Sequence, residues 1–165
     1  MGLTILLSLM LMAGLFLMLY SVVALIQQKR FFSSAPKVVL ENIKPKEERF
    51  HGAHALGYVL AAAAVLCMAS SLIIGAVDGI RNGFSYFQFL VRFLVMFLLL
   101  KVFDILFFDW LLLCHSHFYQ RYYPELEGVL GPELFGFNKK SHLLQIVYSI
   151  AWASIIACVC SVFVK

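Results

Sequence analysis

Four long apolar stretches dominate this 165-residue chain and constrain its fold. They cover residues 3–26, 52–77, 84–118 and 142–164. A helix needs about 20 apolar residues to cross a bilayer, and each stretch has that length. Hydrophobic residues make up 62% of the chain and charged residues only 13%, so one soluble core could not bury the apolar surface. We predict an all-α, polytopic membrane protein, with a single membrane domain (1–165) that forms an up-down-up-down bundle of four transmembrane helices.

The basic residues indicate how these helices are oriented. Six Lys and Arg residues lie in the polar loop 27–51 and three in the polar loop 119–141, whereas the turn after the second stretch carries only Arg81. Because Lys and Arg favour the cytoplasmic side, we expect both loops in the cytoplasm and both termini outside, in the plasma (inner) membrane. The same flanking positions account for the net charge of +4. We therefore expect the lipid bilayer, and no nucleic acid, as a partner.

The first stretch, residues 3–26, contains no charged residue. A secretory signal would have a basic segment before an apolar core of about 7 to 15 residues, and this stretch has neither feature. We interpret it as a retained anchor. Since it has so few polar groups, we expect it to be the most lipid-exposed helix of the bundle.

Small residues recur at a spacing of four in two other stretches. The second stretch has the pairs Gly57/Ala61 and Ser71/Gly75, and we expect its helix to be central. The last stretch has a longer series: Ser149, Ala153, Ala157 and Ser161. Small residues at this spacing let membrane helices approach closely. The last series either seats its helix in the bundle or binds another chain, which predicts a homo- or hetero-oligomer with other membrane subunits.

The third stretch carries four charged residues within a run of Leu, Phe and Val: Arg92, Lys101, Asp104 and Asp109. Each charge at bilayer depth costs roughly 2.5 to 3.5 kcal/mol, so such residues usually face a partner, a cavity or a pathway. We interpret the four as a ligand- or partner-binding face.

Two interpretations of these charges remain open. Lys101 and Asp104 are i,i+3 neighbours that can form a structural ion pair. Alternatively, Asp104 or Asp109 lies in a buried polar pocket, where it titrates during transport or contacts a ligand or a partner subunit. Arg92 falls on the opposite helix face from Lys101, and we expect it to reach the outer interface or to bind Asp78.

All five histidines fall at the predicted cytoplasmic ends of the helices: His51, His54, His115, His117 and His142. Imidazole groups are common ligands of zinc and iron, so these residues are candidates for an interfacial metal site, with a metal ion as cofactor, or for a proton relay. The alternative is that histidine, like Tyr and Trp, is simply accommodated at the interface.

Residues 48–54 read ERFHGAH. This segment resembles the E-R-x-x-x-A-H opening of the second helix in the membrane-associated glutathione and eicosanoid enzymes, which are also four-helix proteins of similar length. The resemblance implies a small membrane enzyme with a thiol cofactor. Ala55, Leu56 and Gly57 follow, where that family has the Asn and acidic residues that help to hold the cofactor.

Two classes of function follow from these patterns, and the sequence leaves open whether the protein is an enzyme. The first is a non-enzymatic membrane subunit or transport-associated component, which engages a partner or ligand through the polar face of the third helix. The alternative is a small membrane enzyme that works at the cytoplasmic interface through its histidines and Asp109. Such an enzyme would depend on a metal or be of the membrane glutathione-transferase type.

Overall fold

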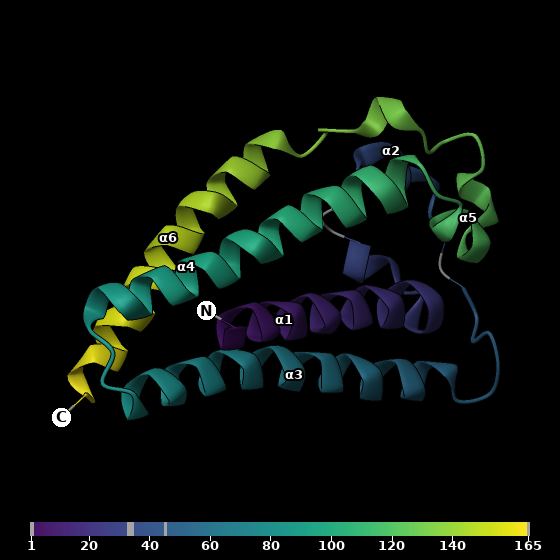
Figure 1. The fold of residues 1–165 in the computed structure, drawn as a ribbon. Coiled ribbons are helices and arrows are strands. Elements are labelled where there is room, and N and C mark those ends of the chain that lie inside the picture. The colour runs from purple at the N-terminus through teal and green to yellow at the C-terminus, as the bar shows by residue number, and fades with distance from the viewer. Residues whose placement is uncertain (1, 33–34, 45, 165) are drawn as a thin grey trace. The chain divides into compact units, whose positions relative to one another are not determined.

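The computed structural model describes residues 2–32, 35–44 and 46–164, and no strand occurs among them (Figure 1). Ser33, Ser34 and Pro45 of the first polar loop lie outside the described residues. The long helical segments are α1 (Gly2–Tyr20) with the π-helix η1 (Ser21–Ile26), α3 (Ala53–Arg81), α4 (Tyr86–Phe103) with the π-helix η3 (Asp104–Cys114), and α6 (Lys139–Val162). The short ones are η2 (Lys29–Phe32), α2 (Lys37–Asn42), α5 (Phe118–Tyr122), η4 (Pro124–Leu126) and η5 (Pro132–Leu134).

Three helical segments are long and apolar enough to cross a membrane: Gly2–Ile26, Ala53–Arg81 and Lys139–Val162. The predicted all-α class is therefore confirmed, and the chain is compatible with a membrane location. The charged segment formed by α4 and η3 is not among the three.

The chain divides into two compact units, and α1, α3 and the segment of α4 and η3 contribute residues to both, whereas α6 belongs to unit 1. Unit 1 contains Met1–Leu15, Val65–Val102 and Lys139–Lys165, and unit 2 contains Phe16–Ala64 and Phe103–Asn138. Each unit is described by itself below. The predicted single domain over residues 1–165 stays a prediction.

Unit 1 has a core built from α1, α4 and α6. Its fully packed members are Leu7, Leu11, Phe89, Phe93, Met96, Ala153, Ala157 and Cys160. Ala153 and Ala157 are 0% exposed, so the small-residue series of the last helix seats α6 in this core, which was one of its two predicted roles. Gly79 of α3 allows a similar close approach, because a Cβ there would lie 2.2 Å from Cε1 of Phe89.

The core of unit 2 joins η1 to the two polar loops. It contains Val22, Val23, Ile26, Phe32, Val39, Ile43, Tyr123 and Leu126. Gly57 of α3 faces η1, since a Cβ at this position would lie 2.7 Å from Cγ1 of Ile26. The small residue predicted to permit close helix packing therefore does so here.

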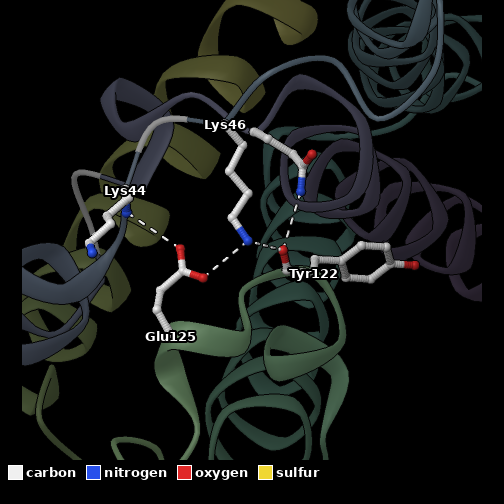
Figure 2. Close-up of polar contacts among 5 residues, drawn as sticks. Lys44, Lys46, Tyr122 and Glu125 are labelled. Atoms are coloured by element: carbon white, nitrogen blue, oxygen red, sulfur yellow. Dashed lines mark hydrogen bonds and ion pairs between the residues drawn. The ribbon is translucent and has the colours of Figure 1, made fainter.

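A polar latch also connects the two loops (Figure 2). The Lys46 ammonium lies 3.0 Å from Oε2 of Glu125 and donates a hydrogen bond of 2.7 Å to the Tyr122 carbonyl oxygen. It also lies 4.7 Å from the centre of the Tyr123 ring. The backbone N–H of Lys44 donates to Oε1 of Glu125 at 3.4 Å. Loop 27–51 and loop 119–141 are thus held against each other.

The expectation that the first helix is the most lipid-exposed is wrong. In Gly2–Ile26, 44% of the residues of the most apolar window are buried, against 17% in each of the other two candidate spans. Thr4, Leu7, Ser8 and Leu11 are buried in α1, and all six residues of η1 are buried. The helix Ala53–Arg81, which was expected to be central, is thus less buried than the first helix. A stretch that is apolar on every side suits lipid and protein neighbours equally, so its composition did not distinguish them.

Candidate functional site

A cavity of about 140 Å³ lies within unit 2 beside the π-helix η3. We call it the η3 cavity. Two acidic residues, Asp104 and Asp109, line it together with Tyr119. The rest of its wall is apolar and comes from α1, η1, the first polar loop, η3 and the second polar loop: Leu19, Val22, Val23, Phe31, Phe32, Ala35, Pro36, Val39, Phe108, Leu113, Leu130 and Phe137. Carboxylates set in an apolar wall are the main chemical feature of this site.

The π-helical geometry explains why Asp104 and Asp109 reach the same cavity. Hydrogen bonds in a π-helix join residues i and i+5, so residues five apart lie one above the other. In a regular α-helix, the same two positions would point about 140° apart. Segments of π-helix are rare and frequently occur at functional sites.

Aromatic packing accompanies the π-helical segment. The rings of Phe103 and Phe107 are stacked with their centroids 4.9 Å apart, and Phe108 meets Phe103 edge-on at 5.4 Å. Phe107 also contacts Phe16 of α1 at 5.7 Å. Phe107 thus packs both against Phe103 and against α1.

Tyr119 of α5 is half-buried and completes the polar part of the cavity. Burial raises the pKa of its hydroxyl, and the negative charges of Asp109 and Asp104 raise it further. The phenol therefore stays protonated at neutral pH and is available as a hydrogen-bond donor. No sequence pattern distinguishes this residue, because it lies in a loop rich in tyrosine.

The four charges of the third stretch separate into two groups. Asp104 and Asp109 line the η3 cavity in unit 2, whereas Arg92 and Lys101 belong to unit 1. Arg92 binds Asp78 at 2.7 Å, which confirms one of its two predicted roles, and donates to the Gly75 carbonyl oxygen at 2.7 Å. The ammonium of Lys101 hydrogen-bonds to Gln145 of α6. The ion pair predicted between Lys101 and Asp104 stays a prediction.

The histidines take up local roles at several places. Nδ1 of His54 lies 3.3 Å from Glu48, and the ring of His115 lies 4.7 Å from that of Trp110. His51 and His117 are exposed in unit 2, while His142 is buried in unit 1. In the described part of the chain, no three His, Cys, Asp or Glu side chains are grouped so as to hold a metal ion. The metal site therefore has no support from the arrangement of these residues.

Residues 48–54, which resemble the opening of a helix in the membrane glutathione enzymes, lead into α3, which begins at Ala53. Besides its contact with His54, Glu48 accepts a hydrogen bond of 3.0 Å from the backbone N–H of Gly52. These contacts satisfy groups at the beginning of the helix, where backbone N–H groups lack partners. The segment thus has a local structural role.

The sequence does contain a signal for the paired carboxylates. The dipeptide Phe-Asp occurs at 103–104 and again at 108–109, so it repeats after five residues, which is the π-helical spacing. With α-helical spacing, Asp104 and Asp109 lie on different faces, so the repeat predicts a shared face only for a π-helix. A scan against protein-family models and searches among curated proteins and solved structures found no match, so the geometry of the η3 cavity carries the functional argument.

Proposed function

We propose that the chain is a non-enzymatic membrane component with four transmembrane helices, which binds a small organic cation in the η3 cavity. The observation that carries the proposal is the convergence of Asp104 and Asp109 on one largely apolar cavity. A pocket with apolar walls and a few convergent polar groups is the usual form of a small-ligand site.

Contacts between the polar loops support a fourth transmembrane segment. The pairing of Lys46 with Glu125 supports a common side of the membrane for loops 27–51 and 119–141. The chain between them contains α3, which is long enough to cross, and then the continuous segment of α4 and η3. If α3 crosses the bilayer, that segment must cross back. The Lys and Arg count favours a cytoplasmic position for the joined loops and an outside position for both termini.

The charges of η3 agree with this topology. Acidic residues within a transmembrane segment are tolerated where they face a cavity or a partner instead of lipid. Asp104 and Asp109 line the η3 cavity, which meets that condition. In the proposed topology, the cavity is expected towards the cytoplasmic side, because both residues lie in the segment next to loop 119–141.

The lining of the cavity selects the chemistry of the ligand. Carboxylates accept hydrogen bonds and attract positive charge, while Phe31, Phe32 and Phe108 offer aromatic surface on which a cation or an apolar ring can rest. An apolar cavity of about 150 Å³ accommodates a benzene-sized molecule. A compact amine with a small apolar body therefore fits both the charge and the size of the site.

Binding of benzylammonium to the purified full-length chain in mild detergent tests the proposal. We expect saturable binding by isothermal titration calorimetry. Benzyl alcohol, which lacks the charge, should bind more weakly. Asp104→Asn and Asp109→Asn should each lower the affinity about tenfold or more, because a hydrogen bond to a charged group contributes roughly 1.5 to 3 kcal/mol.

Glu127→Gln is the matched control, since it removes one negative charge from an exposed position of the same unit. Its affinity for benzylammonium should equal that of the wild type. The proposal fails if the wild type shows no saturable binding of the amine, or if the two Asn variants bind it as well as the control does.

A further inference from the structure

We propose that unit 2 also binds the phosphate group of an anionic membrane lipid, in a groove separate from the η3 cavity. This basic groove has a volume of about 610 Å³ and is lined by Phe16, Tyr20, Arg49, His117, Phe118, Arg121 and Tyr122. None of these residues lines the η3 cavity. The groove combines aromatic rings with positively charged side chains from two polar loops.

The aromatic side of the groove begins on a membrane helix. Phe16 and Tyr20 lie in the candidate span Gly2–Ile26, with ring centroids 6.5 Å apart, and Phe16 is 37% exposed. Tyr20 contacts Tyr122 at 6.4 Å, and Tyr122 contacts Phe118 at 5.5 Å. A continuous row of rings therefore extends from the apolar helix to α5. A lipid bound along this row would have its acyl chains beside the helix and its headgroup beside α5.

The basic side of the groove lies at the loop end of that row. The guanidinium of Arg49 lies 5.3 Å from the centre of the Tyr122 ring, and Arg121 belongs to the same short helix as Tyr122. Burial raises the pKa of the Tyr122 hydroxyl, and the positive charges of Arg121 and Arg49 oppose that rise, so both act at the same ring. In the described part of the chain, neither Arg49 nor Arg121 forms an ion pair with an acidic side chain.

Arginine is well suited to phosphate. Its planar guanidinium offers a fork of N–H donors that matches two phosphate oxygens, and this pairing is stronger than a neutral hydrogen bond. The exposed imidazole of His117 adds a further donor at the same groove. Because Phe16 lies on a membrane span, the apolar part of the occupant belongs to the bilayer. The occupant is therefore an anionic glycerophospholipid.

Native mass spectrometry of the full-length chain can measure this preference. The protein is equilibrated in mild detergent with equal amounts of phosphatidylglycerol and phosphatidylcholine. We expect the wild type to retain the anionic lipid on the order of tenfold more than the zwitterionic one. Arg49→Gln combined with Arg121→Gln should bring the ratio close to one. Lys29→Gln combined with Lys37→Gln removes two exposed positive charges elsewhere in unit 2 and should leave the ratio unchanged.

Three results would overturn the proposal. They are an equal retention of both lipids by the wild type, an unchanged ratio in the arginine variant, and an equal loss in the lysine control. Displacement of the lipid by an equal concentration of sn-glycerol 3-phosphate would assign the groove to free phosphate esters instead.

Benzylammonium binding, measured on the same samples, shows whether the arginine variant is folded and separates this site from the η3 cavity. If that variant does not fold, Arg49→Lys with Arg121→Lys replaces it. This pair keeps both charges but loses the fork geometry, and should still lower the lipid ratio about threefold. An unchanged ratio in this pair would overturn the proposal in the same way.

Discussion

At the scale of single residues, Glu125 and Lys46 show how few side chains join the polar loops of unit 2. Their side chains are 21% and 26% exposed, so water screens the ion pair only in part. The carboxylate also accepts a hydrogen bond from the Lys44 backbone N–H. No local sequence pattern predicts either contact, because Lys44 and Lys46 precede Glu125 by 81 and 79 positions.

The latch predicts a specific dependence of stability on pH. Burial of the Glu125 carboxyl tends to raise its pKa, but hydrogen bonds from its own backbone N–H, from Lys46 and from the Lys44 N–H outweigh this effect and lower the pKa. The folded pKa therefore lies below the unfolded value of about 4.3. The latch stabilises the fold above that value and stops doing so as the pH falls through the folded pKa.

Thermal unfolding of the wild type and of Glu125→Gln checks this prediction. At about pH 6, the variant should be less stable by about 1 kcal/mol, a typical value for a partly exposed ion pair. The gap should narrow towards about pH 3, as the wild-type carboxyl takes up a proton. Glu127→Gln should match the wild type at both pH values. A gap that stays constant across this range would contradict the role given to the charge.

At the scale of elements, α6 shows how one small-residue series divides its roles. Ala153 and Ala157 are fully buried against the α4 side chains of the unit 1 core, whereas Ser149 is only half-buried. Enlarging Ala153 would therefore disturb the fold of the chain itself. A loss of oligomer after this substitution would therefore not show that Ala153 contacts another chain.

A pair of leucine substitutions separates these positions. Ala153→Leu should lower the free energy of unfolding by about 1 to 3 kcal/mol, because a packed core has no room for the larger side chain. Ser149→Leu should change it by no more than about 0.5 kcal/mol. Thermal unfolding in the same detergent measures both. Equal effects at the two positions would show that Ala153 is not enclosed by the core of unit 1.

The π-helix η3 limits what can be read from element patterns. Its apolar content and length predicted a helix over 84–118, and helix covers most of that range as α4 and η3. The predicted faces of its charged residues depend on a period of 3.6 residues per turn. This period does not hold in the π-helix that follows Phe103. The grouping of Asp104 with Asp109 was consequently missed.

At the scale of the whole molecule, the paired loops make the topology testable. A cysteine placed at Glu47 or at Glu127, in a chain whose native cysteines are replaced, should react with a membrane-impermeant maleimide only from the cytoplasmic side. A cysteine at Asn82, in the turn between α3 and α4, should react only from the opposite side. This result follows if α3 and the segment of α4 and η3 both cross the bilayer. Labelling of all three positions from one side would exclude the four-helix topology.

The sequence by itself determined the helical class and the compatibility with a membrane, because long apolar stretches cannot be buried in any other way in a chain of this size. It also singled out the charged residues of the third stretch, since charges within an apolar helix carry a cost that only a partner or cavity removes. The tertiary structure alone decided which of these residues meet. Asp104 and Asp109 share a cavity because η3 changes its helical period, and the two polar loops meet through residues far apart in the chain.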